Sequence, residues 1–240
     1  MDGYADFTFG AGDDVVGKKS KRFKAEGGRT YRASFVWFTD TDGDGLPTDS
    51  AQIKFTGCEA IYHQGLGYVL VDNSNRATML DLLKKQPKQR IATVIVVWPT
   101  DKDGDLDAAS IKAGKGWTVH PWIFDPGKYQ NIGKIHKRFP LTNHDLSMSC
   151  PPDGAQFQKL SFTPEGDNIL RKYLASSNEA LRGVAAKIIK EAAQIAEGIH
   201  RDLARPMTVD EVREGLGEDV ASPTGNHAAA DVDDLLDGVL

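Results

Sequence analysis

The segment IATVIVVW, residues 91–98, is the most hydrophobic stretch in this chain of 240 residues. β-Branched and aromatic side chains favour extended strands, and an almost uninterrupted apolar run is typical of a strand that is buried on both faces. We therefore expect this segment to form the central strand of a sheet. It is also far too short to span a bilayer as a helix.

Segments of strand composition lie on both sides of this central strand in the sequence. They are short and rich in β-branched and aromatic residues, and turns rich in Gly, Pro and Asp separate them. This pattern is typical of an antiparallel barrel or sandwich. A short helix is expected over residues 77–85. The expected strands cover residues 30–38, 52–72 (two strands around Gly65–Gly67), 117–124, 146–150 and 155–163.

A long amphipathic helix is expected after these strands. Beyond Pro164, apolar residues recur at spacings of three and four as far as Ile199, which is the stripe of an amphipathic helix. Ser176 and Glu179 have the spacing of a capping box and predict its start, and the helix should run to about Ala204. We expect the stripe to pack against the sheet, and pairing with a second copy of the helix is the alternative.

The last part of the chain differs from the rest in charge. Thr208 and Glu211 have the spacing of a second capping box, which predicts a short helix. Residues 205–240 hold nine acidic and two basic residues, whereas the whole chain has a net charge of −5. The first 204 residues are therefore nearly neutral, and any basic site in them must be a local patch. The sequence predicts an α+β fold with four parts: a flexible arm over 1–16, a β-rich body with its C-terminal helix over 17–204, a short helix over 205–217, and a linker with a disordered acidic tail over 218–240.

Residues 116–139, GWTVHPWIFDPGKYQNIGKIHKRF, mix aromatic rings with basic side chains. This combination suits single-stranded nucleic acid, because phosphates attract Lys and Arg while unpaired bases stack on rings. The alternative is a β-hairpin whose aromatic residues belong to the core and whose lysines are solvated. Basic runs over residues 18–24 and 84–90 favour the nucleic-acid interpretation. The candidate nucleic-acid-binding residues are Lys18, Lys19, Lys21, Arg22, Lys24, Arg32, Trp37, Lys84, Lys85, Lys88, Arg90, Lys112, Lys115, Trp117, Trp122, Phe124, Lys128, Tyr129, Lys134, Lys137 and Arg138.

An acidic segment, DTDGDG at residues 40–45, has the spacing of the first half of an EF-hand calcium loop. The position that should supply a bidentate glutamate holds Ala51, and the flanking sequence is typical of strands rather than helices. Asp/Gly-rich hairpin tips have the same composition and need no metal. We therefore predict no metal site, and Asp40, Asp42 and Asp44 are the calcium candidates if one exists.

Catalytic motifs are missing from the sequence. It contains no P-loop, no GxGxxG after a strand, no GxSxG and no HExxH, and its six histidines are scattered. Its two cysteines, Cys58 and Cys150, lie far apart, which argues against a disulfide framework or a zinc knuckle and fits a reducing compartment. We expect a cytoplasmic protein that is not an enzyme, has no cofactor and does not enter a membrane.

Two segments resemble phage-encoded single-stranded DNA-binding proteins of the T4 helix-destabilising type. FKAEGGRTYRASFVWF, residues 23–38, looks like the opening strand of that family, and residues 117–139 are similar to its strand, DP turn and basic segment. The zinc-binding His/Cys subdomain of the family has no counterpart here. The resemblance implies binding of single-stranded DNA, and it makes an OB-like barrel the first expectation for the body, with another antiparallel β fold as the alternative.

The chain ends in DVDDLLDGVL, residues 231–240, which mixes acidic and aliphatic residues. This composition is typical of a short docking motif that folds on a partner. The resemblance extends to N4-like phages, which use single-strand binders to bring RNA polymerase to melted promoters, and it implies a phage polymerase or another replication or transcription protein as the partner in the host cytoplasm. The alternative function is a β-rich structural or assembly protein that oligomerises through the long helix. The expected partner-binding residues are Asp231, Asp233, Asp234, Leu235, Leu236, Asp237 and Leu240.

Overall fold

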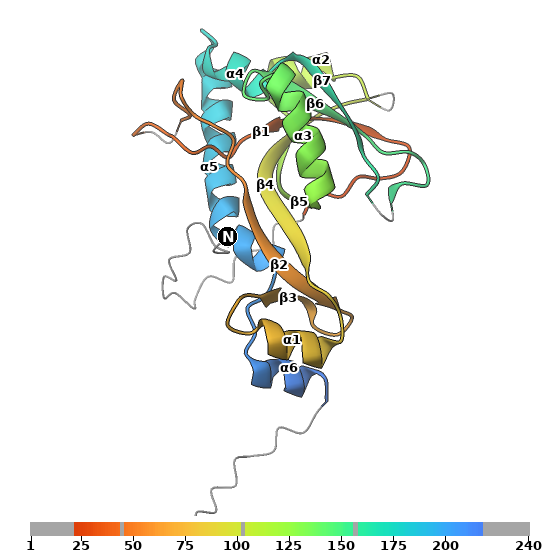
Figure 1. Ribbon diagram of the computed structural model, residues 1–240. Coiled ribbons are helices and arrows are strands. Elements are labelled where there is room, and N and C mark those ends of the chain that lie inside the picture. The colour runs from red at the N-terminus through yellow and green to blue at the C-terminus, as the bar shows by residue number, and fades with distance from the viewer. Residues whose placement is uncertain (1–21, 44–45, 102–103, 156–157, 218–240) are drawn as a thin grey trace, which may run out of the picture.

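The computed structural model describes residues 22–43, 46–101, 104–155 and 158–217, and these residues form an α+β fold (Figure 1). Seven strands make one antiparallel sheet with helices on both faces. The arm expected over residues 1–16 and the linker and tail expected over 218–240 lie outside the described residues. The strands are β1 (Thr30–Phe35), β2 (Thr56–His63), β3 (Gly67–Val71), β4 (Lys88–Trp98), β5 (Thr118–Phe124), β6 (His144–Ser149) and β7 (Ser161–Asp167); the helices are α1 (Arg76–Leu83), α2 (Ala108–Ala113), α3 (Pro126–Arg138), α4 (Ile169–Leu174), α5 (Glu179–Leu203) and α6 (Val209–Gly215).

Strand β4 is the centre of the sheet, as the sequence predicts. β5 pairs along one of its edges, from Ile91 to Val97. β2 pairs with Ala92 and the residues before it, and β1 pairs with Ile95 and the residues after it. Because β5 occupies one edge, β1 and β2 must follow one another along the other edge, and the loop of residues 36–55 joins them.

The sheet diverges at its two ends and stays open. At one end β2 continues to β3, and at the other end β1 continues to β6 and then β7. No pairing among the described strands joins β7 back to β3 or β5. The expected OB-like barrel is therefore not confirmed, because a barrel needs its sheet to close on itself. The broader expectation of an antiparallel sheet in an α+β fold is confirmed.

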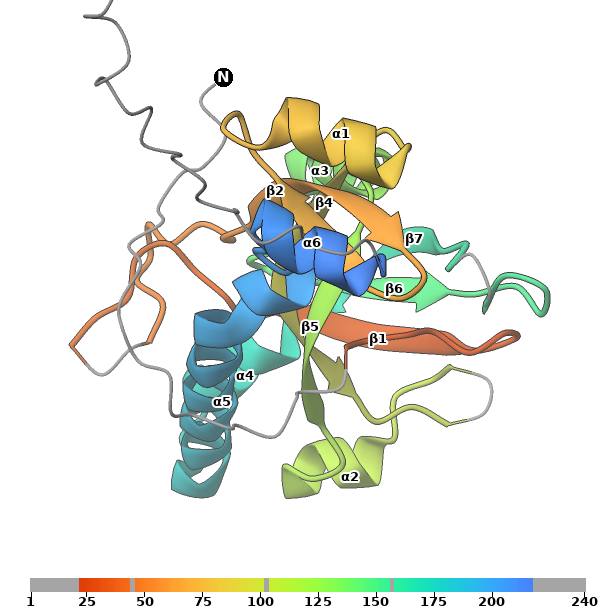
Figure 2. The same cartoon turned by 90° about the horizontal axis from the view of Figure 1, so that it is seen from below.

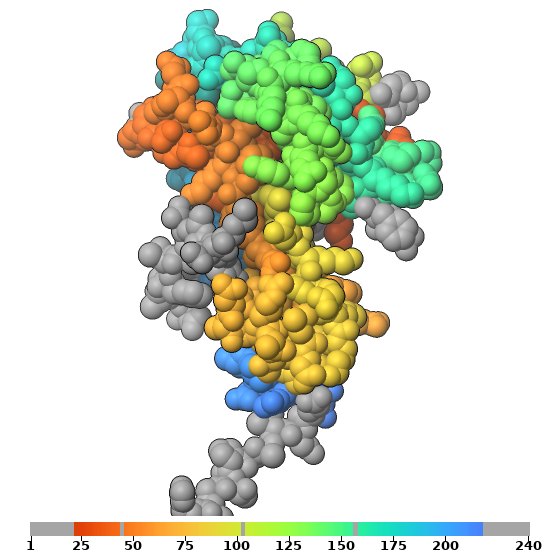
Figure 3. Space-filling model, viewed as in Figure 1, coloured from red at the N-terminus to blue at the C-terminus, as the bar shows by residue number. Residues whose placement is uncertain are grey.

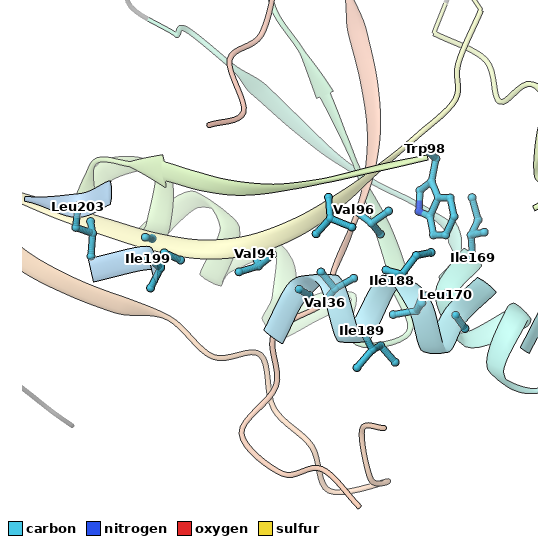
Figure 4. Packing of buried hydrophobic residues seen from close by; sticks show 14 of the residues in the cluster. Val36, Val94, Val96, Trp98, Ile169, Leu170, Ile188, Ile189, Ile199 and Leu203 are labelled. Carbon is cyan, nitrogen blue, oxygen red and sulfur yellow. The ribbon is translucent and has the colours of Figure 1, made fainter. Parts of the chain in front are cut away.

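Helix α5 covers one face of the sheet with its apolar stripe. Ile188 and Ile199 of α5 pack among Val94, Val96 and Trp98, which alternate along β4 and therefore share this face (Figure 4). The expectation that the stripe packs on its own sheet is confirmed. The helix begins two residues later than the capping-box spacing predicts: the N-cap is Asn178 instead of Ser176, and its side chain accepts from the backbone N–H of Ala180.

Helix α3 covers the opposite face, as the view along the sheet shows (Figure 2). Its buried residue Ile132 packs in a second core with Phe35, Ile95 and Trp122. The sequence analysis expected a DP turn after Phe124 that leads into a basic segment, with a β-hairpin as the alternative, and it did not predict a helix; the expected turn is wrong. Asp125 accepts from the N–H of Lys128 as an N-cap and Pro126 occupies the first turn, which together start a helix.

A third core lies under the β2–β3 end of the sheet. Helices α1 and α6 cover Ile61, Val69 and Val71 there, with Met79 and Val212 as their own buried residues. The capping box expected before α6 is present, since the Thr208 and Glu211 side chains each bond to the other residue's backbone N–H. No helix in the described part of the chain is long and apolar enough to cross a membrane.

Candidate nucleic-acid interface

Two tyrosines face each other at the end of the β2–β3 hairpin. Tyr62 and Tyr68 are directly opposite in the register, and their ring centroids lie 5.0 Å apart at an interplanar angle of 52°. Tyr62 is 51% exposed and Tyr68 is 36% exposed. The sequence analysis did not select either residue. They stand at equal distances from Gly65, and this symmetry about a hairpin turn is the signal that could have paired them.

Basic side chains from the α1–β4 connection and from the start of β4 lie on the same side of the sheet as these rings. Nζ of Lys85 donates to the carbonyl oxygen of Tyr62 at 3.1 Å and lies 6.0 Å from the centroid of its ring. The guanidinium carbon of Arg90 lies 3.4 Å from the centroid of the Tyr68 ring. Lys88 is exposed. We call Tyr62, Tyr68, Lys85, Lys88 and Arg90 the hairpin surface.

The sheet register explains how Arg90 reaches a ring two strands away. Arg90 is opposite Cys58, Ala60 is opposite Lys88 on β4 and Leu70 on β3, and Tyr62 is opposite Tyr68. Opposed residues share a face, so all of these side chains point to the α5 side of the sheet. Because Ala60 is small, it leaves room above β2 for the Arg90 side chain to cross to Tyr68.

The first described residue, Arg22, contacts the last turn of α5, and Arg205 just after that turn donates its N–H to the carbonyl oxygen of Tyr68. Nε of Arg22 is 3.5 Å from Oδ1 of Asp202, in the last turn of α5, and the N–H of Phe23 donates to the carbonyl oxygen of Pro121. Lys24, two residues further on, is exposed. The candidates Lys18, Lys19 and Lys21 lie outside the described residues and directly precede Arg22 in the sequence.

The other basic candidates do not join this surface. Lys84 forms an ion pair with Asp81 at 2.6 Å. Lys112 lies in α2 and Lys115 lies just after it, near the Trp98 end of β4. That end is about 30 Å along the strand from Lys88. Helix α3, which carries Lys128, Lys134, Lys137 and Arg138, covers the opposite face of the sheet, and α3 and the β2–β3 hairpin lie toward opposite ends of the molecule (Figures 1 and 3). The sequence placed these cations in one binding site, and the structure divides them among three places.

Most of the predicted stacking aromatics are not available to bases. Trp122 and Phe124 are 2% and 6% exposed and belong to the core beneath α3, so the prediction that they stack bases is wrong. Trp117 is half-buried, and its Nε1 donates to the carbonyl oxygen of Gly114. Trp37 is half-buried against the α5 core with Nζ of Lys54 5.3 Å from its ring. Tyr129 is exposed but stands apart from the hairpin, with its ring edge-to-face on Phe55.

Arg32 has a structural role instead of the predicted role in binding. Its guanidinium forms ion pairs with Asp145 at 3.1 Å and with Glu165 at 2.9 Å, and its side chain is only 14% exposed. Asp145 is fully buried and also accepts from the hydroxyl of Ser34, which in turn accepts from the indole N–H of Trp98. These contacts join β1, β4 and β6 inside the molecule. Lys128 is likewise held in an ion pair, with Asp125.

Asp145 makes the stability of the fold depend on pH. Burial raises the pKa of Asp145 to about 6, although Ser34 and Arg32 act to lower it. An unfolded aspartate titrates near about 3.9, so between these values the folded chain holds the proton more tightly. The stabilisation from this group is complete below about pH 4 and is lost as the pH rises through about 6. We therefore expect the free energy of unfolding of the wild type, relative to that of Asp145→Asn, to rise by roughly 2 kcal/mol between pH 7 and pH 4.

Denaturant unfolding of both proteins across this pH range measures the effect. The comparison with Asp145→Asn is needed because His200 acts in the opposite direction: burial and Lys54 lower its pKa, so its contribution falls as the pH drops below about 6.5. A difference between the two proteins that does not change with pH would contradict the prediction.

The acidic loop before β2 is organised by hydrogen bonds from its own backbone and side chains. Oδ1 of Asp42 accepts from the N–H of Leu46 at 2.8 Å, and Oδ2 of Asp40 accepts from the hydroxyl of Thr39. Asp44 lies outside the described residues. In the part of the chain that the structure describes, no three His, Cys, Asp or Glu residues are grouped to hold a metal ion.

Comparison with known proteins yields no relative. No protein-family model, no curated protein and no solved structure matches the chain. The functional argument therefore rests on the residues of the hairpin surface themselves.

Proposed function

We propose that the protein binds single-stranded nucleic acid, with DNA as the expected ligand, and that the hairpin surface is its binding site. The observation that carries this proposal is the exposed Tyr62–Tyr68 pair with Lys85, Lys88 and Arg90 around it. In the described residues this is the place where two exposed aromatic rings meet several cations.

The chemistry of the hairpin surface matches a flexible strand better than a duplex. Every base has a flat face that can stack on a ring, and only an unpaired base can turn that face toward a protein side chain. Tyr62 offers the more exposed ring, while Tyr68 is fixed by Arg90 on one side. Lys85 and Lys88 supply charge to phosphates on either side of a stacked base.

A partner of the acidic tail completes the proposal. The residues expected to bind it, within 231–240, lie outside the described residues, so this part rests on composition and on the resemblance. We propose that the tail recruits a replication or transcription protein, such as a phage RNA polymerase, to the bound strand in the host cytoplasm. The protein itself would be a binding protein and not an enzyme.

The alternative function, assembly through the long helix, loses its main argument. That interpretation requires the apolar stripe of α5 to be free for a second copy. The stripe is instead covered by the sheet of the same chain, where Ala185, Ile188, Ala192 and Ile199 are buried.

An equilibrium titration tests the proposed function. A short fluorescent single-stranded oligonucleotide is titrated with the full chain at about 50 and 200 mM salt, with unlabelled single strand and duplex as competitors. We expect the single strand to compete and the duplex to compete poorly. Two to four phosphate contacts give a slope of about −1.4 to −2.8 for log affinity against log salt. Absence of binding at the lower salt, or equal competition by duplex, would contradict the proposal.

A further inference from the structure

An arginine nitrogen without a partner is buried at the hairpin surface. Nη1 of Arg90 is buried and has no hydrogen-bond partner among the described residues. The Tyr68 ring lies against the guanidinium and holds its plane in place. A buried donor without an acceptor is costly, and the planar fork of a guanidinium is best satisfied by an oxyanion that presents two acceptors.

Arg22 and Asp202 lie on the Tyr68 side of the sheet, because Arg205, three residues after Asp202, donates its N–H to the carbonyl oxygen of Tyr68 at 2.7 Å. The ion pair between them is long, with 3.5 Å from Nε of Arg22 to Oδ1 of Asp202. Burial has the largest effect on the pKa of Arg90 and lowers it. The charge of Arg22 also lowers this pKa, whereas Tyr68 and Asp202 raise it, so all three side chains act on Arg90. Asp202 pairs with Arg22 alone, so two guanidinium groups share the field of one carboxylate and positive charge is in excess.

We propose that Arg22 and Arg90 form a phosphate-binding seat, and that the carboxylate of Asp202 occupies it when no ligand is bound. A phosphate group would displace Asp202 from Arg22 and supply the acceptor that Nη1 of Arg90 lacks. The expected source, a phosphodiester of single-stranded DNA whose base stacks on Tyr62, rests on the proposed function. Inorganic phosphate has the same oxyanion chemistry and provides an independent probe.

Two variants in the oligonucleotide titration test the seat. Asp202→Asn removes the competing charge and keeps the side-chain shape, so it should bind the single strand about three- to tenfold more tightly. Arg90→Lys keeps the charge but loses the planar fork, so it should bind about tenfold more weakly with an unchanged salt slope. Asp167→Asn is the matched control and should bind as the wild type does, since Asp167, at the end of β7, forms an exposed ion pair with Lys172 of α4. Thermal unfolding of each variant shows whether it is folded.

A second arm replaces the oligonucleotide with inorganic phosphate. Phosphate should raise the thermal unfolding midpoint of the wild type above its value in chloride of equal ionic strength, and it should not do so for Arg90→Lys. A phosphate response without oligonucleotide binding would support the seat and remove the proposed function. Tighter oligonucleotide binding by Asp202→Asn and weaker binding by Arg90→Lys, without a response to inorganic phosphate, would support the seat as a site for the nucleic-acid backbone. Unchanged or weaker oligonucleotide binding by Asp202→Asn, with no phosphate response in the wild type, would overturn the seat.

Discussion

The double variant Tyr62→Ala/Tyr68→Ala should bind single-stranded DNA at least about thirtyfold more weakly than the wild type. Stacking contributes about 1–3 kcal/mol per base, and the variant removes both exposed rings of the hairpin surface. Even the lower value for each ring gives about 2 kcal/mol, which corresponds to about thirtyfold in affinity. The salt slope should change little, because no cation is removed. Fluorescence anisotropy at two salt concentrations measures both quantities.

Two controls separate stacking from damage to the fold. Tyr62→Phe/Tyr68→Phe keeps both rings and should bind nearly as the wild type does. Tyr129→Ala removes a tyrosine of similar exposure, 42%, that lies away from the hairpin, and it should keep wild-type affinity. If Tyr129→Ala loses as much affinity as the double variant, the binding surface is not at the hairpin.

Arg32→Ala should destabilise the protein by about 3–5 kcal/mol, because it leaves the buried carboxylate of Asp145 without its charged partner. The substitution tests the conclusion that Arg32 holds strands together and does not contact nucleic acid. At a temperature where the variant is still folded, its affinity for single-stranded DNA should match that of the wild type. Urea unfolding measures the first effect and oligonucleotide titration measures the second.

The exposed ion pair between Lys172 and Asp167 provides the comparison. Lys172 pairs with Asp167 while both side chains are well exposed, so Lys172→Ala should change the free energy of unfolding by less than about 1 kcal/mol. A loss for Arg32→Ala as small as that for Lys172→Ala would mean that the buried network contributes little. A loss of DNA affinity in a stable Arg32→Ala protein would return Arg32 to the binding site.

The sequence was informative about the fold where composition and periodicity agree. The segment 91–98 has only one plausible use, as a buried strand, and the stripe of α5 has the spacing of a helix over more than six turns. Helix α3 was missed because it begins directly after the strand β5. Its residues Tyr129, Ile132 and Ile135 also have side chains that strands favour. Its start signal, the Asp125–Pro126 pair, was interpreted as a turn, which the same two residues also form.

The candidate site could be predicted from the sequence only in part. The basic run over residues 84–90 is visible in the sequence, and it does supply the cations of the hairpin surface. The rings could not be chosen by composition, because an aromatic residue in a strand has the same local sequence whether it faces core or solvent. Register decides this: Trp122 pairs with Thr93 under α3, whereas Tyr62 and Tyr68 lie on the face of the β2–β3 hairpin opposite the residues that α1 and α6 cover.

The most direct test of the central claim is to find where a bound strand touches the protein. A single-stranded oligonucleotide carrying a photoreactive pyrimidine is crosslinked to the full chain, and the crosslinked peptides are identified by mass spectrometry. We predict crosslinks at Tyr62 or Tyr68, which unlabelled single strand suppresses and duplex does not. Crosslinks confined to α3, around Tyr129, with none on the β2–β3 hairpin, would contradict the hairpin surface as the binding site.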